Sequence, residues 1–196
     1  MMTLVFFLEE LSAKEMLQGI LPKILPEHVV PCFIVFEGKQ DLEKQLVRKL
    51  RRWQQPDSRF IVLRDQDAGE CRQIKQNLVK KCQEAGRPEA IVRIACHELE
   101  SFYLGDLQAV EKGLAENGLT ISGLAKQQNQ KKFRQPDNLP GPARELKILT
   151  GKGYQKISGS RAIGRNLSLE SNRSHSFNVL LTTLRSIVSE DAAAQN

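Results

Sequence analysis

The stretch FIVLRDQD, residues 60–67, decides the fold, because a short run of β-forming apolar residues ends there on two aspartates, Asp65 and Asp67. Apolar residues at residues 60–63 are typical of a strand in the interior of a sheet. Ile74, Leu78 and Cys82 then recur at the spacing of one buried helix face. A strand followed by a helix is the repeating unit of α/β proteins.

The same unit occurs four times along the chain. We expect strands at residues 3–8, 31–36, 60–63 and 91–95. Apolar residues at helical spacing follow them, at residues 16–21, 42–53, 74–82 and 99–110. Strands that alternate with helices predict an α/β fold, a three-layer sandwich around a mostly parallel central sheet.

The pattern loosens after residue 112, and we divide the chain there. Residues 1–112 would form the α/β core. Residues 113–196 would form a basic loop or lid region and a C-terminal helix, at residues 177–188, that packs on the same domain. We expect residues 191–196, at the end of the chain, to be frayed.

Positive charge is concentrated in one part of the sequence. The formal net charge is +6, but residues 126–173 alone contain eleven Lys or Arg and only three acidic residues. A basic segment of this kind suits a polyanionic partner such as nucleic acid. An ordinary solvated basic surface is the alternative interpretation.

The cysteines and the apolar segments bear on where the protein works. Cys32, Cys71, Cys82 and Cys96 lack the paired short spacing of a zinc site, so we read them as reduced thiols of a cytoplasmic protein. The apolar residues 1–8 run directly into two glutamates and are expected to form a strand rather than a signal peptide. No apolar run is long enough to span a bilayer, so we expect no membrane partner.

Carboxylates follow three of the four predicted strands. They are Glu9 and Glu10, Asp65 and Asp67, and Glu98 and Glu100. Because the carboxyl ends of parallel strands share one edge of a sheet, we expect these side chains to converge. Clustered carboxylates repel one another, and a Mg²⁺ or Mn²⁺ ion with oxygen ligands relieves that repulsion. All six are therefore candidate metal ligands, with Glu98 and Glu100 as candidates for a second ion. The alternative interpretation is that Asp65 and Asp67 cap the following helix and that Glu98 is a surface residue.

Several cations are candidates for contacts to nucleic acid. Lys152, Lys156 and Arg161 lie among glycines, which predicts a flexible cationic loop whose backbone amides approach a phosphate. An ordinary mobile turn is the alternative interpretation. The other candidates are Lys39, Arg64 and Arg173.

Five segments carry a resemblance to a known family. They are residues 7–10 (FLEE), 36–42 (FEGKQDL), 63–67 (LRDQD), 98–104 (ELESFYL) and 158–163 (SGSRAI). With them the chain resembles, over nearly its whole length, a Toprim-like bacterial family described as domain of unknown function 4276. That family is related to Toprim nucleases of the overcoming-lysogenization-defect type. A glutamate after the first strand and Asp-x-Asp after the third strand are the signature arrangement of the Toprim domain.

The resemblance implies a Toprim-type nuclease that uses Mg²⁺ or Mn²⁺ on phosphodiesters. Asp65 and Asp67 would be metal ligands, and Glu9 a ligand or general acid/base. The implied role is an effector subunit that works beside an AAA or ABC ATPase in defence against phage. A subunit that only docks and regulates such an ATPase, and a small-nucleotide phosphohydrolase or nucleotidyl transferase, are the alternatives. An oligomer is compatible with each of them.

Overall fold

Four parallel strands form the central sheet of the computed structural model, which describes residues 1–194. The strands are β1 (Met2–Leu8), β2 (Val29–Val35), β3 (Ser58–Asp65) and β4 (Ile91–Ala95). Their order across the sheet is β2-β1-β3-β4, and each neighbouring pair is parallel. The expected parallel sheet is therefore confirmed, with β1 and β3 at its centre.

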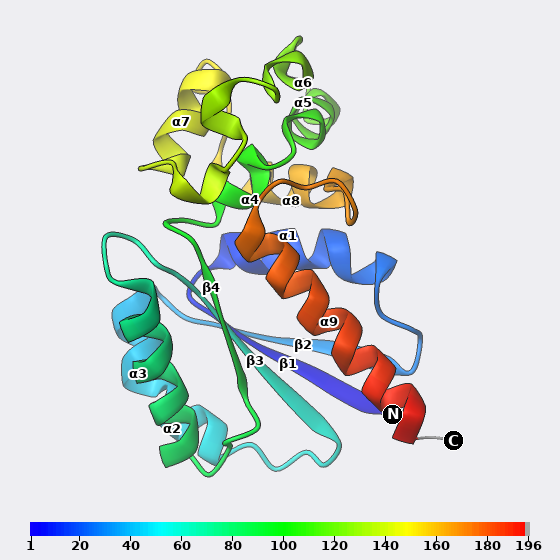
Figure 1. Ribbon diagram of the computed structural model, residues 1–196. Coiled ribbons are helices and arrows are strands. Elements are labelled where there is room, and N and C mark those ends of the chain that lie inside the picture. Colours follow the sequence, from blue (N-terminus) through cyan, green and yellow to red (C-terminus); the bar gives the residue numbers. More distant parts are fainter. Residues whose placement is uncertain (195–196) are drawn as a thin grey trace.

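Helices cover both faces of the sheet, so the expected three-layer α/β sandwich is confirmed (Figure 1). The covering helices are α1 (Leu11–Ile20), α9 (His175–Ala194), α2 (Lys39–Arg51) and α3 (Cys71–Glu84). Along β1, Phe6 and Leu8 pack in the core with residues of α1 and α9, whereas Val5 and Phe7 pack with residues of α2 and α3. Every residue of β1 is buried. A strand covered on both faces needs apolar residues at successive positions, which explains its unbroken apolar run.

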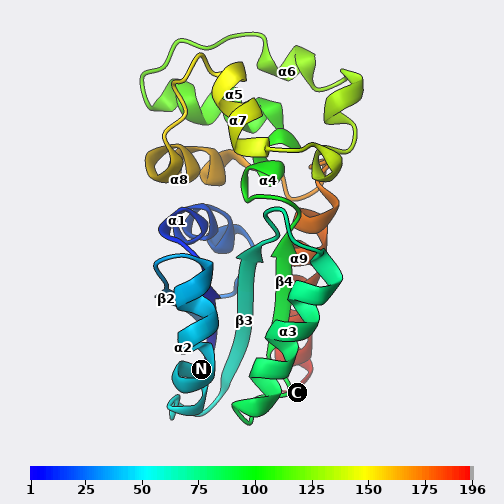
Figure 2. The same ribbon diagram turned by 90° about the vertical axis from the view of Figure 1, so that its left-hand side faces the viewer.

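A helical part lies beyond the carboxyl edge of the sheet (Figure 2). Its helices are α4 (Glu100–Leu104), α5 (Leu107–Glu116), α6 (Leu124–Gln127), α7 (Pro142–Leu149) and α8 (Lys156–Asn166). Three short 3₁₀ turns complete the fold: η1 (Leu21–Lys23), η2 (Lys131–Phe133) and η3 (Pro136–Asn138). The single helix expected at residues 99–110 is divided, because Asp106 Oδ1 accepts a hydrogen bond from Ala109 N at 3.0 Å and so caps a new helix. The expected division at residue 112 falls inside that helix, α5.

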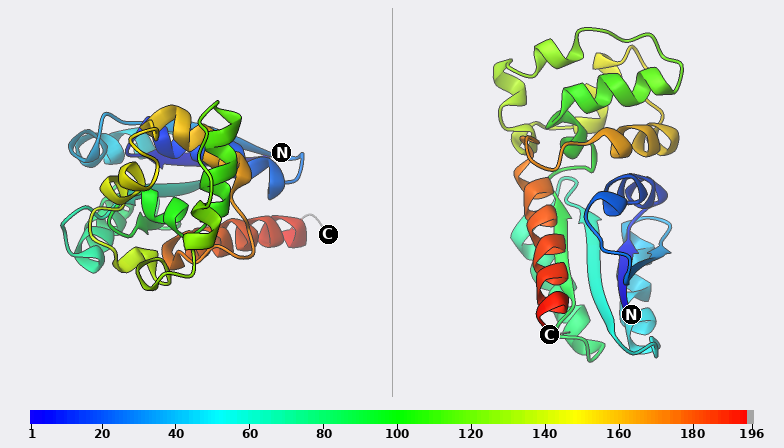
Figure 3. Two further views of the ribbon diagram at one scale, coloured as in Figure 1. Left: turned by 90° about the horizontal axis from the view of Figure 1, so that it is seen from above. Right: turned by 90° about the vertical axis from the view of Figure 1, so that its right-hand side faces the viewer.

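Residues 156–166 are a packed helix, which corrects the expectation of a flexible cationic loop up to residue 164. Helix α8 packs closely on α1 (Figure 3). A Cβ atom on Gly164 would lie 2.7 Å from Met16 O, and one on Gly19 would lie 2.5 Å from Arg165 N. Both neighbours are backbone atoms that cannot rotate away, so these glycines permit the two helices to approach one another. For Gly164 this role in helix packing replaces the approach to phosphate that the sequence suggested.

The C-terminal helix is longer than expected. Helix α9 continues through Ala194, where His28 Nε2 lies 2.9 Å from Asp191 Oδ2 and ties the end of the helix to the segment before β2. The expectation of a frayed end is therefore wrong for residues 191–194, and residues 195–196 lie outside the described part of the chain. Between residues 1 and 194, no helix combines the length and the apolar character that a membrane crossing needs.

Candidate active site

Glu9 and Asp65 meet at the carboxyl ends of the two central strands. Strands β1 and β3 are paired with Leu8 opposite Leu63, so Glu9, which follows Leu8, lies beside the last residues of β3. Glu9 Oε2 accepts a hydrogen bond from the backbone N–H of Asp65 at 3.2 Å. The buried Arg64 holds the same carboxylate, with Nε 3.7 Å from Glu9 Oε2. The sheet itself thus fixes two of the predicted site residues beside one another.

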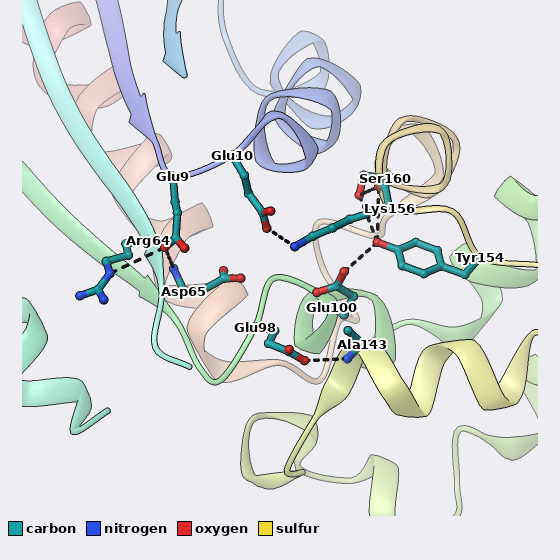
Figure 4. Close-up of polar contacts among 10 residues, drawn as sticks. All are labelled: Glu9, Glu10, Arg64, Asp65, Glu98, Glu100, Ala143, Tyr154, Lys156 and Ser160. Carbon is teal, nitrogen blue, oxygen red and sulfur yellow. Dashed lines mark hydrogen bonds and ion pairs between the residues drawn. The ribbon is translucent and has the colours of Figure 1, made fainter. Parts of the chain in front are cut away.

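Glu10 and Glu100 join this pair from the other side, together with Lys156 at the start of α8 and Tyr154 in the segment before it (Figure 4). Lys156 Nζ lies 2.6 Å from Glu10 Oε1. The hydroxyl of Tyr154 donates a hydrogen bond to Glu100 Oε1 at 2.9 Å. We call Glu9, Glu10, Asp65 and Glu100 the carboxylate cluster. Lys156 and Tyr154 form its wall toward the helical part.

Asp65, Glu9 and Glu100 of the carboxylate cluster hold their protons more tightly than ordinary carboxyl groups do. Burial raises the pKa of Asp65 well above its usual value, and the charges of Glu9, Glu10 and Glu100 raise it further. Burial also raises the pKa of Glu9, although the hydrogen bond from the Asp65 backbone acts in the opposite direction. The pKa of Glu100 is raised chiefly by burial, against the influence of Lys156. Burial is the largest cause of all three shifts, and neighbouring negative charges add to each of them.

The donor set fits a hard divalent cation. Carboxylate oxygens are the ligands that Mg²⁺ and Mn²⁺ prefer, and buried Glu100 Oε2 has no hydrogen-bond partner among the described residues. As the side chains lie, no three His, Cys, Asp or Glu residues within residues 1–194 are arranged to hold a metal ion. A metal would therefore require carboxylates to rotate toward one another, and in the case of Glu10 to leave Lys156.

Asp67 is held separately from the carboxylate cluster. Its backbone adopts a left-handed conformation, with φ of 55°, and its Oδ2 lies 2.8 Å from Lys39 Nζ. The charge of Asp67 still contributes to the raised pKa of Glu9. Lys39 and Asp67, both predicted as site residues, are therefore paired with one another at the border of the site.

Glu98 has a structural partner. Its Oε2 accepts a hydrogen bond from the backbone N–H of Ala143 at 2.8 Å, in the first turn of α7. A carboxylate in that position satisfies a free N–H group and complements the positive end of the helix. The loop after β4 thereby anchors α7 beside the site.

Arg161 and Arg173 are engaged elsewhere. Arg161 on α8 forms an ion pair with Glu15 on α1. Arg173 donates hydrogen bonds to Gln128 O at 2.6 Å and to Asn129 Oδ1 at 2.8 Å. Lys152 remains exposed in the turn between α7 and α8. Of the predicted cations, Lys156 and Arg64 make the direct contacts with the carboxylate cluster.

Sequence reasoning missed Tyr154 and Ser160. The Tyr154 hydroxyl lies 3.3 Å from Ser160 Oγ as well as bonding Glu100. The ring of Tyr154 is seated where Gly159 leaves room, since a Cβ there would lie 2.6 Å from the ring. Tyr154 is 54 residues from Glu100 in sequence, and no local pattern indicates that the two would meet.

Comparison with known proteins assigns the chain to a family. The family model described as Domain of unknown function (DUF4276) matches residues 8–185, and the chain belongs to this family. The match includes every residue of the carboxylate cluster and of its wall. No curated protein and no solved structure matches the chain.

Proposed function

We propose that this protein is a Toprim-type nuclease that depends on Mg²⁺ or Mn²⁺ and cuts phosphodiester bonds in nucleic acid. One observation carries the proposal: Glu9, Asp65 and Glu100 come from three different elements to one place, and the pKa of each is raised. Burying acids together costs folding free energy, so the arrangement is expected where a function requires it.

The acidic residues at the strand ends would have different roles in the reaction. Asp65, Glu9 and Glu10, with Asp67 and the second pair Glu98 and Glu100 as further candidates, supply oxygen ligands at the strand ends. A bound divalent ion would neutralise a non-bridging phosphate oxygen and lower the pKa of a water molecule. Glu9, whose pKa is raised by burial, is suited to hold and release a proton, as a general acid or base does.

Lys156 and Arg64 complete the charge balance. Although burial lowers the pKa of Lys156, the neighbouring carboxylates outweigh it and the pKa is raised, so the ammonium group stays charged. If Glu10 served as a ligand of a divalent ion, Lys156 would lose its ion-pair partner and would be free to contact the phosphate. Arg64, which bridges Glu9 and Glu43 at 3.7 and 3.0 Å, keeps Glu9 oriented.

The wider role follows from the resemblance to Toprim nucleases of the overcoming-lysogenization-defect type. We propose a cytoplasmic effector subunit that acts beside an AAA or ABC ATPase in defence against phage. Residues 1–196 contain no G-x-x-x-x-G-K-[ST] loop, so ATP hydrolysis would be supplied by the partner.

Cleavage assays test the proposal directly. Plasmid, single-stranded DNA and tRNA are incubated with the purified protein and Mg²⁺ or Mn²⁺, alone and with the candidate ATPase. We expect cleavage that EDTA stops and that Asp65→Asn abolishes. In parallel, saturating Mn²⁺ at about 100 times its Kd should stabilise the protein by about 2.7 kcal/mol, and Asp65→Asn should lose that gain. A protein that neither cuts nor binds a divalent ion in calorimetry would refute the proposal.

A further inference from the structure

We propose that the cavity between α7 and the start of α8 binds the backbone phosphates of a nucleic acid strand whose next phosphodiester lies at the carboxylate cluster. The inference rests on the proposed nuclease function and names its substrate as a polynucleotide. The cavity has a volume of about 910 Å³, and its lining includes Arg144, Lys147, Lys152 and Lys156. We call it the α7–α8 cavity.

The lining of the α7–α8 cavity carries positive charge without compensating negative charge. Its four cations face no acidic residue in the lining. Lys156 alone forms an ion pair, with Glu10; Arg144, Lys147 and Lys152 have no carboxylate within ion-pair distance anywhere in residues 1–194. Unpaired cations around one hollow attract phosphate groups and release counterions when these bind.

The α7–α8 cavity adjoins the carboxylate cluster through shared residues. Lys156 and Tyr154 line the cavity, and the same two side chains contact Glu10 and Glu100. A phosphate held by Lys147 or Lys152 and a phosphate at the carboxylates would therefore belong to one continuous strand. A mononucleotide at the carboxylates would leave the outer cations without a partner, so the extended cationic lining favours a polynucleotide.

The turn that presents Lys152 is pre-formed. Gly151 and Lys152 both have left-handed backbones, with φ of 55° and 67°. Lys152 N donates to Lys147 O at 2.7 Å, and Tyr154 N donates to Thr150 Oγ1 at 3.1 Å. A turn fixed by its own hydrogen bonds loses little entropy when a ligand binds.

The α7–α8 cavity also offers an apolar surface. Ile148 projects from α7 among the cations and is 63% exposed. Nucleic acid strands combine anionic oxygens with apolar base faces, and single strands are bound by pairing a positive groove with surfaces on which bases pack. A strand with unpaired bases matches both features.

Binding measured without metal tests the inference independently of cleavage. A labelled single strand of 20 nucleotides, as DNA and as RNA, is titrated in EDTA with the full-length protein, and fluorescence anisotropy is followed at several salt concentrations. The test variant is Arg144→Gln, Lys147→Gln, Lys152→Gln. The control variant, Lys44→Gln, Arg48→Gln, Lys49→Gln on α2, removes the same charges from another exposed helix surface. Thermal unfolding verifies that both variants are folded.

We expect the α7–α8 variant to bind at least tenfold more weakly, and the slope of log K against log salt to shrink by about two, since each phosphate contact to a single strand contributes about 0.7. The control variant should retain most of the wild-type affinity. The inference is overturned if the wild-type protein binds no strand, if a mononucleotide competes as well as the strand, or if both variants weaken equally.

The two proposals fail in different ways. Metal-dependent cutting by a protein whose strand affinity does not depend on the α7–α8 cavity would overturn the cavity inference and leave the nuclease standing. Strand binding through the cavity by a protein that neither cuts, alone or with the ATPase, nor binds a divalent ion would uphold the binding site and refute the nuclease.

Discussion

Replacing Gly164 with alanine should loosen the contact between α1 and α8 that holds Glu10 and Lys156 together at the candidate active site. The new methyl group would lie 2.7 Å from Met16 O and 2.8 Å from Met16 Cα. Both are backbone atoms, so the overlap is relieved only if the helices move apart. Because α1 follows Glu10 and α8 begins with Lys156, that movement would also disturb the ion pair between these residues.

The size of the effect follows from two opposing terms. Overpacking of a close contact costs about 1–3 kcal/mol, and we place this contact near the top of that range because no side chain can yield. Alanine in place of glycine inside a helix stabilises the folded protein by about 1 kcal/mol through its higher helix propensity. The net loss is about 2 kcal/mol, which for a protein of 196 residues lowers Tm by about 4–8 °C.

Urea denaturation of Gly164→Ala beside Ser158→Ala provides the measurement. Ser158 is an exposed residue of the same helix, so its replacement tests helix propensity without the steric overlap. We expect Ser158→Ala to be neutral or slightly stabilising. If Gly164→Ala were as stable as Ser158→Ala, the account of these glycines as packing residues would be refuted.

Three further substitutions test the electrostatics of the site. Asp65→Asn should raise the Tm of the metal-free protein at pH 7.5, because the pKa of Asp65 is raised and its ionisation above its ordinary pKa therefore costs stability. The gain in Tm should vanish as the pH falls to about 4, where Asp65 is protonated in the unfolded chain as well. A lower Tm of the variant at pH 7.5 would contradict this. Tyr154→Phe removes the hydroxyl that serves buried Glu100 and should cost about 1–3 kcal/mol in urea denaturation, whereas unchanged stability would show that the hydrogen bond contributes nothing. Lys39→Ala should change stability by less than about 1 kcal/mol, since the ion pair between Lys39 and Asp67 is exposed. The same substitution should strengthen Mn²⁺ binding in calorimetry, because it frees Asp67. Weaker binding would argue that Asp67 is no ligand.

The sheet was accessible to sequence reasoning because its signals are local. Short runs of β-forming, mostly apolar residues located all four strands, and the positions of Glu9 and Asp65 at the ends of two of them predicted their meeting. A parallel sheet brings strand ends together whatever the loops do, so this step needed no knowledge of long-range packing.

The helical part was less accessible because its contacts join distant segments. The glycines of α8 were read as loop residues, but Gly164 faces Met16, which is far away in the chain, and Gly159 makes room for the ring of Tyr154. Tyr154 and Lys156 acquire their roles only when α8 is docked on α1. The break before α5 had a local signal in Asp106, a typical helix-capping residue, and could have been found.

The docking of α8 on α1 has a consequence for how the chain can be divided. Helix α1 belongs to the first twenty residues, and its partner surface arrives only with residues 156–166. A fragment that ends at residue 112 would leave the surface of α1 that packs on α8, including Met16, facing water, together with the sheet face that α9 covers. We expect such a fragment to aggregate, so that expression trials should keep both ends of the chain and place affinity tags or fusion partners only outside them.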